Sequence, residues 1–93
     1  MIKTFGDSAT KAIYEGRSPK GVPSDLLRRI RIQLNLIASA AALSDLRNPP
    51  SNQLKAIKSV SGLYSIRVNQ QFRIVFRWSD SGVEDVQFCD YKH

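Results

Sequence analysis

The feature that most constrains this chain is its last third, residues 64–93, in which apolar and polar residues alternate through three successive segments. Alternation with a period of two is typical of strands that bury one face and expose the other. In the middle segment, Phe72 and Ile74 fall on one face, whereas Arg73 and Arg77 fall on the other. Because short polar turns separate the segments, the pattern predicts a three-stranded antiparallel meander.

The alternation also predicts how the first two strands of the meander pair. Opposed residues in an antiparallel pair point to the same face, so a shift of one residue would exchange the buried face for the exposed one. A three-residue loop over 69–71 keeps the two faces separate, because it places Ile66 opposite Ile74 and Arg67 opposite Arg73. A two-residue loop would mix the faces, and the three-residue loop is therefore preferred.

The second turn is expected to contain three residues, 80–82, by the same reasoning. The pairs that follow from this register are Phe76 with Val86, Ile74 with Phe88, and Arg77 with Asp85. On the other face the register places Arg73 beside Cys89, and Tyr91 lies one step beyond Cys89.

This other face carries Arg67 and Arg73 directly opposite each other, with no acidic residue in register with either. Like charges in this arrangement destabilise a sheet. Arg77, in contrast, can be neutralised by Asp85. Two interpretations remain open: the face is an ordinary solvated surface, or it is a concave anion-binding site that uses unpaired arginines.

The N-terminal part of the chain predicts one edge strand and one short helix. Residues 2–5 form an apolar segment that can add to the edge of the sheet. Asp7 or Ser8 can cap a helix through Tyr14, and Gly16 can end it.

A longer helix is expected to begin with Ser24 as its N-cap. Its apolar stripe has helical spacing and consists of Leu26, Leu27, Ile30, Leu34, Ile37, Ala38 and Ala41. Three arginines lie largely off this stripe, namely Arg28, Arg29 and Arg31. They are either part of a solvated helix face or contacts for phosphates or an acidic partner. A further helical turn over 42–46 and a loop or short extended segment over 51–58 lead into the meander.

The order of elements predicts a single α+β domain over residues 1–93. Its antiparallel sheet consists of the N-terminal strand and the C-terminal three-stranded meander, and two helices pack on one face of that sheet. The helices cover the apolar face that contains Ile66 and Ile74, and the face with Arg67 and Arg73 stays uncovered.

Composition restricts the environment and the partners of the chain. A net charge of +6 favours polyanions such as nucleic acid, the ribosome or an acidic protein. A single cysteine excludes an internal disulfide. The sequence contains no apolar run of the length of a membrane span and no secretory leader at its start, so we expect a cytoplasmic protein with no membrane partner.

Few residues could carry catalytic chemistry. The only histidine is His93, a Cys89–His93 nucleophilic pair lacks a third orienting group, and neither a metal site nor a phosphate-binding glycine loop is evident. Cleavage of RNA needs no cofactor, because the 2′-hydroxyl is its own nucleophile and requires only a base, an acid and cations around the phosphate. Asp90, Tyr91 and His93 could supply the base and the acid, and the cations could be Lys58, Arg67 and Arg73.

At these residues the chain resembles the HigB branch of the RelE/ParE superfamily, the toxins of bacterial type II toxin–antitoxin modules. The matching segments occur in order along the whole chain. They are Met1-Ile2-Lys3-x-Phe5, Gly21-Val22-Pro23, Leu43-x-Asp45-Leu46-Arg47-x-Pro49-Pro50, Asn52-x-Leu54, Tyr64-Ser65-Ile66-Arg67-Val68-Asn69-x-Gln71-Phe72-Arg73-Ile74, and Asp90-Tyr91.

The resemblance implies a metal-independent, ribosome-dependent endoribonuclease that cleaves mRNA in the ribosomal A site. It also implies neutralisation by a HigA-type helix-turn-helix antitoxin, and binding to operator DNA only through the toxin–antitoxin complex. The catalytic residues that it implies are Lys58, Arg73, Asp90, Tyr91 and His93. The flanking RNA or phosphate contacts are expected to be Lys55, Arg67, Arg77 and Lys92.

Three departures from the family pattern bear on activity. Lys55 stands where efficient members often have a histidine, the basic turn after Lys58 is one residue shorter and lacks its arginine, and Lys92 separates Tyr91 from His93. One inserted residue would turn His93 to the opposite face of a strand. Either the histidine reaches the site through a bend, or Lys92 replaces it as a phosphate ligand or acid.

The alternative hypothesis is therefore a weakly active or non-catalytic binding module. Its basic surface would block the ribosome or another target, such as the DNA gyrase bound by the ParE branch. A third option is a decayed toxin that is kept for its antitoxin-binding surface.

Overall fold

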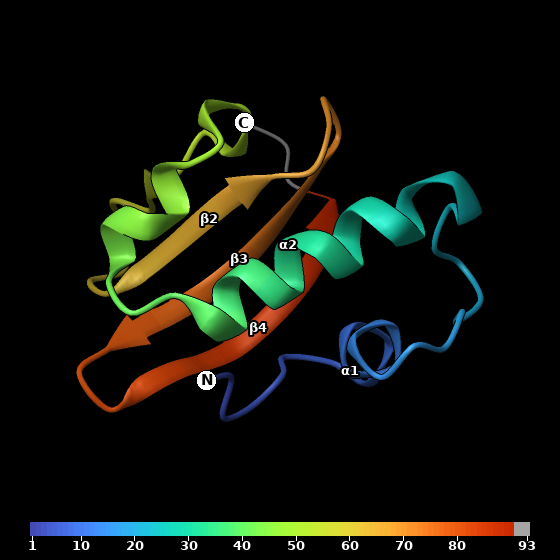
Figure 1. Cartoon of the computed structure of the whole chain (residues 1–93), viewed down its shortest axis with the longest axis horizontal. Helices are drawn as coiled ribbons and strands as arrows, with labels where there is room; N and C mark the ends of the chain where they lie inside the picture. The colour runs from blue at the N-terminus through green and yellow to red at the C-terminus, as the bar shows by residue number, and fades with distance from the viewer. Residues whose placement is uncertain (91–93) are drawn as a thin grey trace.

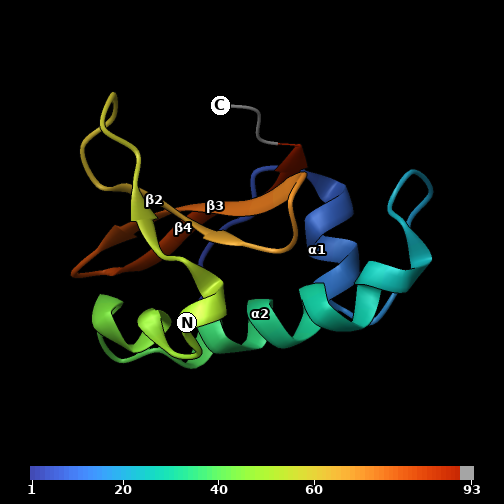
Figure 2. The same cartoon turned by 90° about the horizontal axis from the view of Figure 1, so that it is seen from above.

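The computed structural model describes residues 1–90. It contains the helices α1 (Ser8–Tyr14) and α2 (Leu27–Ser39) and the strands β1 (Lys55–Ala56), β2 (Leu63–Arg67), β3 (Phe72–Ser79) and β4 (Gly82–Asp90). Three short 3-10 turns complete it, namely η1 (Ser24–Leu26), η2 (Leu43–Arg47) and η3 (Pro50–Asn52). The four strands form one antiparallel sheet in the order β1-β2-β3-β4, and α2 lies across one of its faces (Figures 1 and 2). The predicted α+β class is confirmed.

The predicted pairing of the first two meander strands is confirmed residue by residue. Ile66 lies opposite Ile74 and Arg67 lies opposite Arg73. The side chain of Asn69 closes the loop, because its Oδ1 accepts hydrogen bonds from the backbone N–H groups of Gln71 at 2.8 Å and Phe72 at 2.7 Å.

The predicted second turn is wrong in its length. Ser79 pairs with Gly82, so the loop has two residues, and a bulge follows at Asp85, whose φ is 55°. The bulge places both Val83 and Val86 in the core, where they are 1% and 0% exposed. These valines are three residues apart, and strict alternation cannot put both on one face. Beyond the bulge the predicted register returns, with Ile74 opposite Phe88 and Arg73 opposite Cys89.

The predicted N-terminal edge strand exists only as two isolated bridges. Ile2 and Phe5 bridge in parallel to Val83 and Val86 of β4. The backbone N–H of Lys3 donates to the carbonyl oxygen of Val83 at 2.7 Å. The bridged residues are three apart on both segments, so the N-terminal segment follows the bulged edge of β4 and does not continue as a ladder.

The two helices begin with different local chemistry. Asp7 is the N-cap of α1, as one of the two predicted alternatives, and its Oδ1 accepts from the N–H of Thr10 at 2.8 Å. Ser24 is not the N-cap of the long helix: Pro23 precedes a 3-10 turn, and regular α-helix begins at Leu27. A tight 3-10 turn is common at a helix N-terminus.

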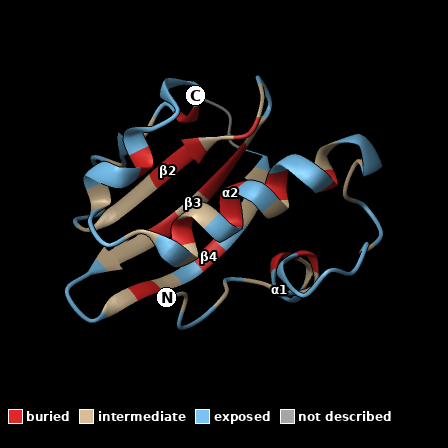
Figure 3. Cartoon of the chain, viewed as in Figure 1, coloured by how far each residue is buried: buried red, intermediate tan, exposed pale blue. Residues whose placement is uncertain are grey.

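The core lies between α2 and the sheet (Figure 3). Ile30, Leu34 and Ile37 of α2 are fully buried. They pack in one cluster with the apolar face of the meander, which contributes Ile66, Ile74, Phe76, Val83 and Val86. In the described part of the chain, neither helix has the length and apolar character needed to cross a bilayer.

Candidate functional site

The face of the sheet opposite α2 is here called the outer face. Ten residues that the strand registers place on it are Lys55, Leu63, Ser65, Arg67, Arg73, Val75, Arg77, Glu84, Gln87 and Cys89. No helix of the described chain covers this face (Figure 2). Positive charge gathers on it because four of these ten residues are lysine or arginine and one is acidic, and Lys58 lies in the adjoining loop.

Arg73 is the residue whose environment differs most from the prediction. It was expected on an open surface, but it is only 5% exposed. Its Nε donates to Oγ of Ser65 at 2.7 Å, and its Nη2 donates to the carbonyl oxygen of Gln53 at 2.7 Å. The guanidinium is therefore held in one orientation between β2 and the segment that precedes β1.

Gln53 is one of the residues that hold Arg73. Gln53 follows η3 and has a left-handed backbone, with φ of 43°, which turns its carbonyl oxygen toward Arg73. Lys55 follows two residues later, pairs with Ser65 and is exposed. Arg73 thus anchors the segment that presents Lys55 beside the outer face.

Arg67 and Lys55 lie close to Arg73 along the sheet. Arg67 is directly opposite Arg73, and it is half-buried. Lys55 opposes Ser65, two residues before Arg67 on β2. These three cations form a compact basic group, which we call the basic cluster.

Lys58 and Arg77 are at the other end of the sheet. Lys58 is exposed in the loop that joins β1 to β2, and the N–H of Ile57 closes this loop on the carbonyl oxygen of Leu63 at 2.8 Å. Arg77 opposes Leu63, four residues along β2 from Arg67, or about 13 Å at the rise of a strand. Its Nε lies 3.5 Å from Oδ2 of Asp85, so the predicted ion pair is present although Glu84 is the residue in register.

The structure does not place Asp90 beside the basic cluster. Asp90 pairs with Phe72, which belongs to the alternation of the helix-covered face, and its Oδ2 accepts from Nε2 of Gln71 at 3.0 Å. The preceding residue, Cys89, is opposite Arg73. The described chain therefore ends next to the basic cluster. The predictions for Tyr91, Lys92 and His93 concern residues outside the described ones.

Cys89 lies on the outer face, where its thiol is partly buried. Burial, and then the carboxylates of Asp7 and Asp90, raise the pKa of this thiol above its ordinary value. The thiolate, which is the nucleophilic form, is therefore disfavoured at neutral pH.

Sequence reasoning missed Ser65 and Gln53 as partners of Arg73. The register predicted from the sequence already placed Ser65 on the outer face, two residues from Arg67. The approach of Gln53 had no local signal, because it depends on a loop that folds back from outside the meander.

The arginines of α2 also have structural roles. Nε of Arg29 donates to the carbonyl oxygen of Val68 at 2.5 Å. Arg31 donates to the carbonyl oxygens of Ile13 at 3.2 Å and Arg17 at 2.8 Å. Both side chains connect α2 to neighbouring segments, whereas Arg28 is exposed.

The sheet, the two helices and their order define a RelE-like toxin fold. A chain of the solved YoeB–YefM complex from Staphylococcus aureus has this fold: it superposes on this protein with a TM-score of 0.61, over 100% of this chain and 99% of that chain, at 16% sequence identity. The family model of the RelE-like toxin HigB of type II toxin–antitoxin systems matches residues 3–92, and the chain belongs to this family.

Curated relatives agree with this assignment. Toxin HigB-1 of Vibrio cholerae serotype O1 is 34% identical over 82 residues, which cover 86% of each chain. Endoribonuclease HigB of Proteus vulgaris is 29% identical over 92 residues, which cover 98% of this chain and 99% of that protein. The resemblance noted in the sequence is thereby confirmed: the protein is a HigB-like toxin of a type II toxin–antitoxin system.

Proposed function

We propose that this toxin is a metal-independent endoribonuclease that cleaves mRNA in the ribosomal A site, and that the outer face of its sheet binds the RNA. The observation that carries the proposal is the basic cluster of Lys55, Arg67 and Arg73 on a face that no described helix covers. Like charges directly opposite each other destabilise a sheet, and a bound phosphate group would offset this repulsion. The name of the Proteus vulgaris relative, an endoribonuclease, supports the same activity.

The proposed reaction uses the RNA's own nucleophile. The 2′-hydroxyl attacks the adjacent phosphorus and gives its proton to a base, and the bond to the 5′-oxygen breaks as an acid protonates that oxygen. Negative charge develops on the phosphate oxygens as both steps proceed. A cationic group whose orientation is fixed before reaction stabilises this charge most effectively. Arg73 is fixed in this way by Ser65 and Gln53.

The remaining roles follow from position and residue type. Arg67 and Lys55 provide phosphate contacts beside Arg73, and Lys58 and Arg77 extend the contact along the RNA backbone. We assign the base and the acid to the C-terminal residues Asp90, Tyr91 and His93, with Lys92 as a further phosphate ligand. In support, Cys89, which immediately precedes Asp90, lies opposite Arg73.

The experiment is expression of wild-type, Arg73→Ala and Tyr91→Ala chains from an inducible promoter, with growth and mRNA 5′ ends measured together. Wild-type protein should arrest growth and create new 5′ ends within translated codons, and both variants should lose these effects. If both variants arrest growth and cleave like the wild type, the proposed site is wrong.

We also propose a cytoplasmic partnership with a HigA-type helix-turn-helix antitoxin, which neutralises the toxin. The complex would bind operator DNA through the antitoxin. The family assignment and the solved fold relative, which was determined as a YoeB–YefM complex, support a protein partner of this kind.

One observation favours a second candidate, a toxin that blocks its target without cutting. Arg73 is engaged by Ser65 and Gln53, and Asp90 belongs to the alternation of the helix-covered face. A basic surface of this kind can bind the ribosome or a target such as DNA gyrase electrostatically. Intact mRNA during growth arrest, in cells and with purified translating ribosomes, would favour this candidate.

A further inference from the structure

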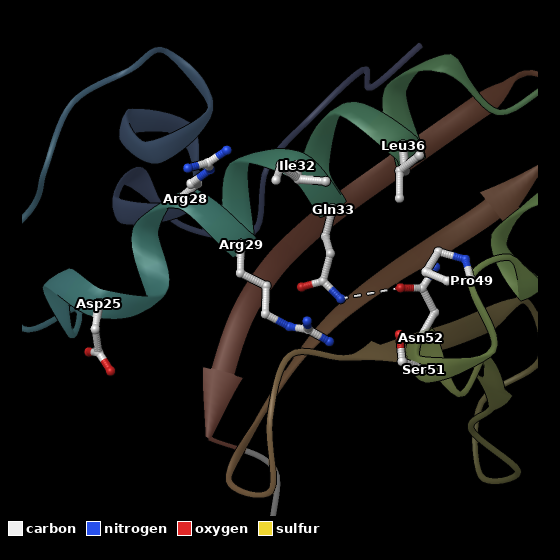
Figure 4. A pocket seen from close by; sticks show the side chains of 9 residues that line it. All are labelled: Asp25, Arg28, Arg29, Ile32, Gln33, Leu36, Pro49, Ser51 and Asn52. Carbon is white, nitrogen blue, oxygen red and sulfur yellow. Dashed lines mark hydrogen bonds between the residues drawn. The ribbon is translucent and has the colours of Figure 1, made fainter.

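One side of α2 carries a second stripe of residues, which is exposed at Arg28 and Ile32 and meets the edge of the core at the partly buried Leu36. Arg28, Ile32 and Leu36 follow at intervals of four, so they lie along one side of the helix. Ile32 is 52% exposed, more than any other large apolar residue of the described chain except Met1. Together with the turn at Pro49–Asn52, this stripe borders a groove of about 330 Å³, here called the α2 groove (Figure 4).

Buried hydrogen bonds hold the floor of the α2 groove. Gln33 is 3% exposed, and its Nε2 donates to the carbonyl oxygen of Arg67 at 2.7 Å and to Oδ1 of Asn52 at 3.4 Å. Asn52 is 1% exposed and donates to the carbonyl oxygens of Leu46 at 3.2 Å and Asn48 at 3.3 Å. The two walls of the groove, α2 and the turn at Pro49–Asn52, are thus joined by buried side chains with defined hydrogen bonds.

Its polar network is also incomplete. Oε1 of Gln33 is buried and accepts no hydrogen bond from the described residues. A buried acceptor is normally paired. This oxygen is therefore a buried acceptor without a partner among residues 1–90, on a residue that lines the groove.

The charge around the groove is unbalanced. Arg28 and Arg29 line it, against one acidic residue, Asp25, at the start of the helix. Arg28 makes no hydrogen bond or ion pair with any of residues 1–90, and the whole chain has a net charge of +6. An apolar strip with arginines at its border is complementary to an amphipathic helix whose polar side is acidic.

We propose that the α2 groove docks an acidic amphipathic helix of the antitoxin, an inference that rests on the antitoxin partner proposed above. Apolar residues of that helix would pack on Ile32 and Leu36, and its carboxylates would pair with Arg28 and Arg29. Because α2 covers the face of the sheet opposite the basic cluster, this contact leaves the proposed RNA face uncovered. Two residues that line the groove, Arg29 and Gln33, also donate hydrogen bonds to the carbonyl oxygens of Val68 and Arg67.

The test measures binding of the purified product of the adjoining antitoxin gene by isothermal titration calorimetry. Ile32→Glu and Arg28→Glu are the groove variants. Asn35→Glu is the control for the first because Asn35 is also exposed on α2 but does not line the groove. Lys20→Glu is the control for the second because it makes the same charge change at an exposed position that does not line the groove. Circular dichroism of all four variants verifies that they are folded, as exposed positions should allow.

The proposal predicts that each groove variant weakens binding at least about tenfold, while each control stays within about twofold of the wild type. In cells, Ile32→Glu should arrest growth like the wild type but escape the antitoxin. If the antitoxin binds all variants equally, the groove is not its docking site, although the partnership itself stands. If it does not bind the wild type, the antitoxin partnership is refuted along with the groove.

A second copy of the chain is the competing occupant, and sedimentation velocity separates the two cases. A wild-type dimer that Ile32→Glu dissociates, with unchanged antitoxin affinity, would overturn the proposal. A monomer at all concentrations used for calorimetry is the result expected here.

Discussion

Replacing Ser65 with alanine tests whether Arg73 is a positioned cation. Ser65 is 2% exposed, and its Oγ accepts the 2.7 Å hydrogen bond from Nε of Arg73. Hydrogen bonds to charged groups contribute about 1.5–3 kcal/mol, and the substitution also leaves a buried charged donor without this acceptor. We therefore expect Ser65→Ala to lower the free energy of unfolding by about 2 kcal/mol.

Urea denaturation measures this loss. With a slope of about 1 kcal/mol per molar for a chain of this size, the midpoint should fall by roughly 2 M without a change of slope. Ser44→Ala, at an exposed position in η2, is the matched control and should change stability by less than about 0.5 kcal/mol.

The double variant with Arg73→Met makes the test specific. If the serine acts through the guanidinium, Ser65→Ala should cost much less in the Arg73→Met background, because the interaction is already lost. Toxicity should fall in Ser65→Ala although no charge on the outer face has changed. Equal costs in both backgrounds, or full toxicity of a folded Ser65→Ala protein, would refute a positioning role for Ser65.

Three further predictions follow from other parts of the molecule. Asp7→Ala removes the N-cap of α1 and should lower the free energy of unfolding by about 1 kcal/mol in a thermal melt, whereas Asp7→Asn should restore most of it. Leu34→Ala empties a fully buried position between α2 and the sheet and should cost about 2–5 kcal/mol in urea denaturation. The raised pKa of the Cys89 thiol predicts slow alkylation by iodoacetamide at pH 8, and the rate should increase only as the pH rises further. Because the folded state favours the neutral thiol, the contribution of this thiol to stability is present at neutral pH and lost at alkaline pH. Alkylation at the rate of a free thiol in the folded protein would contradict the last of these.

The sequence predicted the parts of the fold that depend on local pattern. Alternation set the pairing of Arg67 with Arg73 and of Ile74 with Phe88, and the family resemblance matched the confirmed toxin class. The loop after β3 escaped this reasoning because Val83 and Val86 are both buried, which requires the bulge at Asp85. A pattern with a period of two contains no signal for one residue in a left-handed conformation.

The candidate site was predictable in its composition but not in its packing. Charge and register identified Arg67 and Arg73 as an unusual pair on the face opposite the helices. The guanidinium of Arg73 donates to the carbonyl oxygen of Gln53, which is twenty residues away in the sequence. Contacts of this kind arise when a loop packs back on a sheet, and no local propensity encodes them. The same holds for the α2 groove, whose second wall is the turn at Pro49–Asn52.

The most direct test of the central claim is mapping of mRNA 5′ ends in a purified translation reaction that contains this chain. The wild type should produce cuts within the A-site codon only when ribosomes are translating. The double variant Lys55→Ala/Arg67→Ala should reduce cutting at least about tenfold. It should remain folded, because neither side chain is buried in the core. Uncut mRNA in a reaction whose translation has stopped would contradict the account, as would a folded double variant that cuts as well as the wild type.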